Sequence, residues 1–338
     1  MRRGSILVAA LHVTLARPST WPLALGTFLL RGGFLLILLP IIVVPTPVGI
    51  GNLLAPALNA ISLGAIPVGF VLACAAIGVG VVMWLGLAGW LAGMLEAAGV
   101  RIVTDATALR ASDGAGVAAS SRANDSDEPP TGRDGARILA CRLVCLVPVA
   151  IALAIGSVRL VFVTYQELTL PSDTGTPIAM RVLRDAPEVP IAILVIWMSA
   201  EILAAIAARR IVVAGDGVRW ALRAAIVSVG RRPLHAICRF WLPTIVLALI
   251  VVAAGLAASA AWSVVKDTVE GSTSPLAALV ATVAFVGLWL VGLALIAVAS
   301  AWRAAVWTVA AVAEAGTFGG STDRRPGDWR PDPRSATL

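Results

Sequence analysis

Two charged residues fall inside long apolar runs of this sequence and could do chemistry there. Glu201 is the one acidic residue within such a run, and Arg31, followed by two glycines, lies near the middle of another. A carboxylate in a bilayer costs about 2.5–3.5 kcal/mol on insertion scales, so Glu201 should face a partner or water. At about 1.5 Å per helical residue, the two charges have similar depths. We predict an Arg31–Glu201 ion pair, as a structural link or as part of a transport switch; separate positions are the remaining alternative.

A third charge, Arg159, lies about five residues from the end of another apolar run. The apolar stem of arginine allows its guanidinium to snorkel to the membrane surface, where Glu167 could receive it. Elsewhere, Gly89 and Gly93 form a GxxxG pattern. Small residues four apart allow helices to approach closely. We expect this pattern to pack helices within the monomer, with a dimer face as the alternative.

Motifs of enzymes and of metal sites are absent from the sequence. It contains no HExxH, GxSxG or GxxxxGK[ST] pattern. Cys141 and Cys145 are four residues apart, so they share one helix face. With no further ligand nearby, we interpret them as small buried residues. We therefore predict no catalytic residue, no cofactor and no metal ligand, and the sequence does not favour an enzyme.

The elements that carry these residues are predicted to be membrane helices. The chain is 59% hydrophobic and 13% charged, whereas soluble domains have roughly 25% charged residues. A bilayer core requires about 20 apolar residues of helix. This predicts an all-α bundle of six transmembrane helices near 21–44, 66–95, 143–165, 189–208, 241–263 and 276–300.

The charges between the spans alternate in sign and predict the orientation of the chain. Segments 1–20, 96–142, 209–240 and 301–338 hold 21 arginines and 12 acidic residues. The loops at 45–65, 166–188 and 264–275 hold three basic and six acidic residues. Cytoplasmic loops carry the excess of Lys and Arg. Both termini should therefore be cytoplasmic, in a multi-pass protein of the inner (cytoplasmic) membrane.

Two segments are predicted to form helices at the membrane surface. Residues 1–17 resemble a signal peptide, but an interfacial helix leading into the first span is the favoured interpretation. In 217–231, Arg219 and Arg223 fall on one face with Trp220 near its boundary, which indicates an amphipathic interfacial helix. A surface for a cytoplasmic partner is the alternative. The apolar face consists of Val218, Leu222, Ile226 and Val229.

The chain divides into two membrane parts and two polar segments. Residues 1–104 hold the interfacial helix and spans one and two, and residues 136–318 hold spans three to six. Between them, 105–135 is rich in small, polar and acidic residues, which predicts a disordered cytoplasmic linker. The tail at 319–338 is predicted to be disordered in the same way. The uncharged segment 45–65 is broken by proline and glycine, so it should lie at the outer interface or re-enter the membrane.

Short motifs give the chain a family resemblance. They are Arg17-Pro18 before span one, Glu201 with the Ala-rich helix leading to Arg209-Arg210, and Arg231-Arg232-Pro233 before span five. With these motifs the chain resembles bacterial six-span integral membrane proteins, and it is similar to the membrane domain associated with glycerophosphodiester phosphodiesterases. The resemblance implies no enzymatic activity and no particular substrate.

The predicted function is that of a non-enzymatic membrane scaffold or accessory subunit. The alternative is a small permease whose pathway contains Arg31 and Glu201. The expected partners are the lipid bilayer and a membrane or cytoplasmic protein. Because the arginines flank apolar runs, nucleic acid is not an expected partner.

Overall fold

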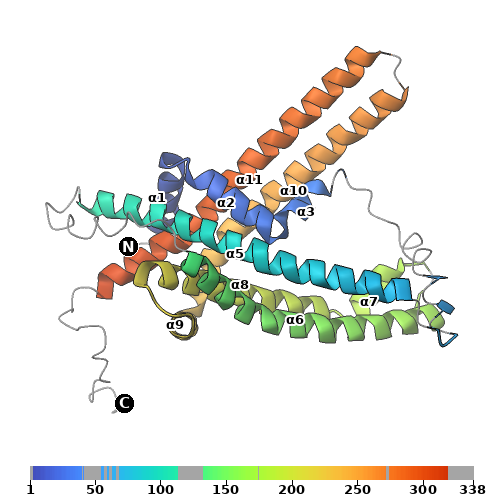
Figure 1. The fold of residues 1–338 in the computed structure, drawn as a ribbon, viewed down its shortest axis with the longest axis horizontal. Coiled ribbons are helices and arrows are strands. Elements are labelled where there is room, and N and C mark those ends of the chain that lie inside the picture. The colour runs from blue at the N-terminus through green and yellow to red at the C-terminus, as the bar shows by residue number, and fades with distance from the viewer. Residues whose placement is uncertain are drawn as a thin grey trace, which may run out of the picture.

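The computed structural model shows the chain as a set of helices (Figure 1). It describes residues 3–39, 41, 55–56, 59–60, 63–65, 68–112, 132–173, 175–271 and 274–318. No strand occurs in these residues, which confirms the all-α class. The elements are α1 (Arg3–Ala16), α2 (Thr20–Phe28), the π-helical turn η1 (Leu29–Gly33), α3 (Phe34–Leu38), α5 (Val68–Ser112), α6 (Gly132–Thr169), α7 (Ile178–Asp185), α8 (Glu188–Ala214), α9 (Val218–Arg231), α10 (Pro233–Gly271) and α11 (Pro275–Phe318).

Six helical segments of the described chain are long and apolar enough to cross a bilayer, as predicted. Most extend beyond the apolar runs of the sequence, because alanine, leucine and arginine in the flanks are good helix formers. The architecture is therefore that of a multi-pass membrane protein. The six segments are Thr20–Leu38, Val68–Ala108, Gly132–Thr169, Glu188–Ala214, Pro233–Gly271 and Pro275–Glu314.

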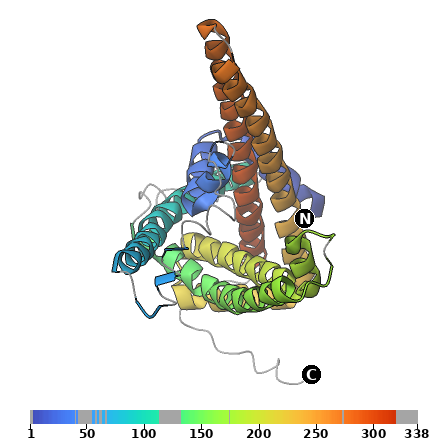
Figure 2. The same ribbon diagram turned by 90° about the vertical axis from the view of Figure 1, so that its right-hand side faces the viewer.

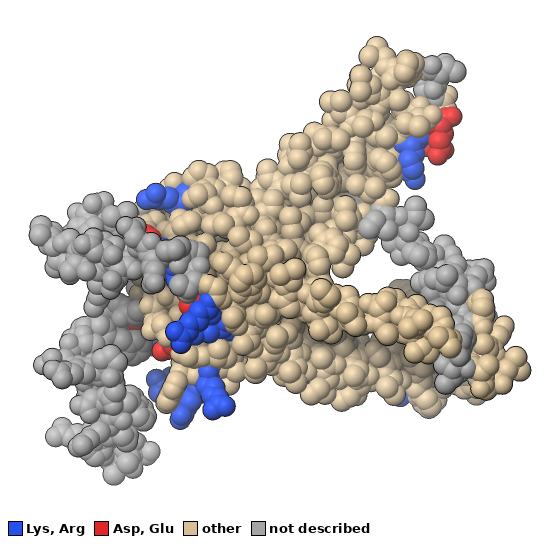
Figure 3. All heavy atoms as spheres, viewed as in Figure 1, with Lys and Arg blue, Asp and Glu red and all other residues tan. Residues whose placement is uncertain are grey.

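The long helices diverge from one end of the molecule as two arms (Figures 1 and 2). The hairpin of α10 and α11 forms one arm, and α5, α6 and α8 form the other, with α7 at its far end. We call the common end, where α1 and α9 also lie, the vertex. On the face in Figure 3, charged side chains gather at the vertex and at the tip of the α10–α11 arm, with an uncharged surface between them. An uncharged band of this kind matches the hydrocarbon layer of a bilayer.

Glycines allow α5 and α6 to pack closely near the vertex. A Cβ added at Gly93 would lie 2.7 Å from the carbonyl oxygen of Gly135, and one at Gly89 would lie 2.7 Å from Cδ1 of Leu139. Both positions belong to the GxxxG pattern, which lets helices approach. The prediction that this pattern packs helices within the monomer is confirmed.

The first span is interrupted at Arg31 and Gly32. Arg31 has φ −88° and ψ 18°, and Gly32 has φ 97°, which lies in the left-handed region. In this region a residue with a Cβ atom has a conformational energy about 1–2 kcal/mol less favourable than in the right-handed region, but glycine does not. The glycine therefore permits a kink between α2 and α3, and Arg31 lies at that kink.

The helix expected over residues 1–17 is present as α1, which packs against the vertex. Ala10 and Val13 are buried against α5 and α11. The indole nitrogen of Trp302 in α11 donates a hydrogen bond of 3.2 Å to the carbonyl oxygen of Leu7. These contacts attach the N-terminal helix to the last span.

The helix expected over 217–231 is present as α9, but its buried face differs from the prediction. Ala221 and Ala225 are fully buried against α5, α6 and α8, whereas Ile226 is exposed. Alanine lets α9 approach α8 closely, so the contact centres on the small residues. Val218 and Leu222 of the predicted apolar face also pack against this cluster, so part of the face expected at the membrane surface contacts the protein instead.

The linker expected over 105–135 is helical at both ends, which corrects its boundaries. Helix α5 continues to Ser112, and α6 already begins at Gly132. The extension of α5 has a packing partner, because Val103 and Ala106 are buried against α1 and α11. Residues 113–131, the tail at 319–338 and most of 45–65 lie outside the described residues.

Candidate functional site: a charged cavity at the vertex

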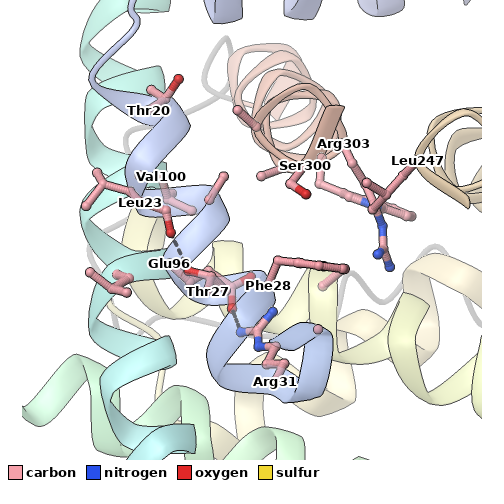
Figure 4. A pocket seen from close by; sticks show the side chains of 18 of the residues that line it. Thr20, Leu23, Thr27, Phe28, Arg31, Glu96, Val100, Leu247, Ser300 and Arg303 are labelled. Carbon is pink, nitrogen blue, oxygen red and sulfur yellow. Dashed lines mark hydrogen bonds and ion pairs between the residues drawn. The ribbon is translucent and has the colours of Figure 1, made fainter. Parts of the chain in front are cut away.

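A cavity of about 370 Å³ lies where both arms meet the kinked first span. This volume falls in the range of about 300–1,000 Å³ that is typical of ligand pockets. Figure 4 shows Thr27, Arg31 and Glu96 on one side of the cavity and Ser300 and Arg303 on the other. Among the described residues, six charged side chains from five different elements line the wall: Arg31, Glu96, Arg142, Glu201, Arg209 and Arg303.

Glu96 of α5 is the most enclosed carboxylate of this cluster. Its Oε1 lies 2.6 Å from Nη1 of Arg209, and its Oε2 lies 3.1 Å from Nη2 of Arg142. Arg31 also pairs with Oε2. The side chains of Glu96 and Arg209 are only 6% and 4% exposed. One buried carboxylate is thus compensated by three arginines, and these pairs join η1, α5, α6 and α8.

Glu201 of α8 lies nearer the opening and is held more loosely. Its two carboxylate oxygens lie 3.5 Å from Arg142 and 3.5 Å from Arg303. Charge-assisted hydrogen bonds are about 2.7–2.9 Å long. The guanidinium of Arg303 also lies 5.4 Å from the centre of the Phe240 ring. Arg303 therefore has donor capacity that its contacts within the described residues do not use fully.

The predicted ion pair between Arg31 and Glu201 is wrong, although both residues line the same cavity. Arg31 pairs with Glu96 instead. The predicted second span ends at residue 95, so Glu96 was expected in a loop. Helix α5 continues well beyond that point, and the kink at Gly32 places Arg31 beside it.

Four of the six charged residues were missed because each lies at the end of an expected span. Glu96 and Arg209 come one residue after a span, Arg142 comes one residue before a span, and Arg303 comes three residues after one. All four were counted as charges of cytoplasmic loops. Their common position at one side of the membrane was the available signal, since charges at the same depth on neighbouring helices can meet.

Three polar atoms on the cavity wall are buried without a hydrogen-bond partner among the described residues. They are Nε of Arg142, Nε of Arg209 and Oγ of Ser300. A buried polar group left unpaired costs about 1–3 kcal/mol. Four arginines and two glutamates also leave the wall with a formal excess of two positive charges. The cavity therefore offers donors and positive charge to an anion.

Arg159 lies at the surface, but its predicted partner is wrong. Its Nε lies 3.4 Å from Oε1 of Glu188 at the start of α8. Glu167 is instead buried against Arg181 of α7, with 2.9 Å between Oε2 and Nη1. Helix α7 folds back over the end of α6 and brings Arg181 to the carboxylate, which sequence spacing alone does not reveal.

The residues predicted for the interfacial helix lie away from the cavity. Arg219, Trp220 and Arg223 are exposed on α9. The guanidinium of Arg223 lies 5.6 Å from the centre of the Trp220 ring, which is a cation–π contact. This exposed face combines positive charge with an aromatic ring, as membrane-surface helices do.

A second group of charged side chains lies around α7, outside the cavity wall, and consists of the pairs Glu167–Arg181 and Arg184–Asp185. No group of three or more His, Cys, Asp or Glu residues in the described chain could hold a metal ion. Cys141 and Cys145 are buried on α6 as free thiols. The charged cavity is therefore the candidate functional site.

Comparisons with known proteins add no further assignment. No family model matches this chain, and no match was found among curated proteins or solved structures. The fold and the cavity define a multi-pass helical membrane protein with an internal cluster of paired charges.

Proposed function

We propose that this protein is a small permease of the cytoplasmic membrane and that the cavity at the vertex is its substrate site. The observation that supports this most is the broken first span on the cavity wall, at Arg31 and Gly32. Transporter sites are typically built in part from discontinuous helices. Ionisable residues within membrane segments also mark substrate or ion pathways.

The position of Glu201 favours a permease over a closed bundle. A scaffold needs no internal space, whereas a permease needs a polar cavity with charged groups on its wall. Glu201 and Arg303 line the cavity and keep about a quarter of their side-chain surface exposed. A loosely held ion pair beside a cavity can exchange partners when a ligand enters.

A scaffold or accessory subunit remains the second candidate, because the same charges also link the helices. Glu96 pairs with arginines from three other elements. Such a network is suited to holding a fixed arrangement of spans. The exposed face of α9 around Trp220 would then contact the membrane surface or a cytoplasmic protein.

An enzyme is less well supported, although the number of polar groups in the cavity would be sufficient for one. Both glutamates are held by arginines, so neither is free to act as a general base. Ser300 has no hydrogen-bond partner among the described residues that would activate its hydroxyl.

Access to the cavity from both sides of the membrane tests the permease proposal without knowledge of the substrate. Ser300→Cys and, separately, Thr27→Cys are made in a chain whose four native cysteines are replaced by alanine. The reagent is a small, membrane-impermeant methanethiosulfonate. A permease that alternates between inward and outward states should become modified at either position from both sides.

The matched control is Leu249→Cys on α10, a residue whose side chain is largely exposed on an apolar surface. In lipid it should stay unmodified from either side. Modification of Ser300→Cys and Thr27→Cys from one side only, or from neither, would overturn the permease proposal in favour of the scaffold.

A further inference from the structure

We infer that the cavity binds an anionic amphiphile, with a phosphate headgroup on the arginines and apolar chains along α3, α10 and α11. This rests on the proposed function, because it names the substrate class of the same site. Four features of the structure carry it: the charge of the wall, an adjacent apolar crevice, the opening and the depth.

The charge of the cavity wall matches a phosphate monoester. Its formal excess is two positive charges, and a phosphate monoester carries about −1.5 to −2 near pH 7. Guanidinium groups bind phosphate oxygens through paired N–H donors. Arg303 has unused donors, and Nε of Arg142 and the Ser300 hydroxyl are buried without partners in the described chain. An entering phosphate would take the unused donors of Arg303 directly, whereas the two buried atoms have almost no accessible surface and would be reached only after a side chain moves.

An apolar crevice lies beside the cavity. Leu36 of α3 lines both the cavity and this second space of about 20 Å³ between α3, α10 and α11. None of the described residues that line the crevice is charged. A headgroup in the cavity would thus place its chains against apolar side chains.

The cavity opens toward the space between the arms. Leu36, on the cavity wall, is 51% exposed, and its neighbours Leu35 and Leu39 are similarly exposed. Helix α3 lies where the two arms diverge (Figure 1). Exposed leucines on a membrane-spanning segment face lipid. A ligand with apolar chains can therefore enter sideways from the bilayer, which a free inorganic anion cannot do.

The charges lie in the half of the membrane that belongs to the vertex side. The exposed pair of Arg159 and Glu188 joins α6 to the start of α8, on the side of the arm away from the vertex. From Glu188 to Glu201, and from Arg159 to Arg142, the helices rise about 20 and 26 Å. The hydrocarbon core is about 30 Å thick. Glu201 and Arg142 therefore lie roughly 10 and 4 Å inside the hydrocarbon core on the vertex side, so the cluster is nearer to the headgroups of that leaflet than to those of the other.

Equilibrium binding to the detergent-purified full chain tests this inference. The probe is radiolabelled dioctanoyl phosphatidic acid, and the competitors are the unlabelled lipid, dioctanoyl phosphatidylcholine and inorganic phosphate. We expect the unlabelled lipid to displace the probe and the other two to be at least about tenfold less effective, because each lacks either the net charge or the chains. Arg303→Gln should weaken binding about tenfold or more, through the loss of a charged hydrogen bond.

Two further variants separate loss of the site from loss of the fold. Arg239→Gln removes an arginine that pairs with Glu314 and does not line the cavity, and it should bind like the wild type. Ser300→Leu keeps all six charges but fills part of the cavity, so it should also lose binding while remaining monodisperse. If Arg303→Gln does not fold, lipid binding by Ser300→Leu shows whether the cavity is the binding site.

Three results would overturn the inference. Inorganic phosphate that competes as well as the lipid indicates a free-anion site, and phosphatidylcholine that competes equally shows that charge is irrelevant. Wild-type binding by both Arg303→Gln and Ser300→Leu places the lipid elsewhere. If the introduced cysteines are not modified from both sides but the lipid still binds, the permease proposal is rejected and the lipid site stands. If they are modified from both sides but the lipid does not bind, the protein is a permease for another substrate.

Discussion

At the scale of single residues, the two glutamates of the cavity have unequal roles. Glu96 is almost fully enclosed and compensates three arginines, whereas Glu201 is partly exposed and makes longer contacts. Removing one partner of a buried ion pair typically costs about 3–5 kcal/mol, because the remaining charge is uncompensated. We therefore expect Glu96→Gln to be strongly destabilising and Glu201→Gln to cost only on the order of 1 kcal/mol.

The measurement is the apparent midpoint of thermal unfolding in one detergent, which should fall clearly further for Glu96→Gln. Glu314→Gln is the control, since its side chain is about half exposed and lies outside the cavity. Exposed ion pairs contribute about 0–1 kcal/mol. Equal losses for Glu96→Gln and Glu201→Gln would contradict the central position of Glu96.

At the scale of elements, the kink in the first span depends on the conformation of Gly32. A Cβ there would meet no atom within 4 Å, so only the positive φ of 97° opposes a side chain. We expect Gly32→Ala to destabilise the protein by about 1–2 kcal/mol or to straighten the span. Gly78→Ala in α5 is the matched control. Gly78 also has open space around its Cα, but its backbone is helical. Alanine should therefore stabilise the helix there by about 1 kcal/mol relative to glycine.

Opposite shifts of the thermal midpoint, down for Gly32→Ala and up for Gly78→Ala, are the expected result. Reduced modification of Thr27→Cys in the Gly32→Ala background would connect the kink to access. If Gly32→Ala instead raises the midpoint and leaves access unchanged, the span does not need its kink.

The elements also show what the sequence could and could not reveal. Six spans were predictable, because apolar runs of about 20 residues have few alternatives in a bilayer. The ends of α5 and α6 were not, because Val103 and Ala106 are helical through contacts with distant α1 and α11. The cavity was predicted only through Arg31 and Glu201. Which charged residues pair with one another in the cavity depends on the kink at Gly32 and on packing between helices far apart in sequence.

At the scale of the whole molecule, the charges and the two arms are consistent with one arrangement. The vertex carries α9, the cavity and most of the arginines among the described residues, whereas α7 and the α10–α11 turn lie at the far ends of the arms (Figures 1 and 3). A cytoplasmic vertex places the arginine-rich segments inside and the acidic loops outside. The lateral opening between the arms then lies within the bilayer.

This arrangement predicts that α7 and α9 lie on opposite sides of the membrane. The test uses Met180→Cys and Trp220→Cys, each introduced into the chain without native cysteines. The two native side chains are 63% and 65% exposed. A difference in the reactivity of the two cysteines therefore reports the side of the membrane on which each lies. In intact cells an impermeant maleimide should modify Met180→Cys, and Trp220→Cys should react only after permeabilisation, because arginine-rich segments resist translocation. Modification of Trp220→Cys from outside, or of both positions from the same side, would invert the orientation and place the cavity in the other leaflet.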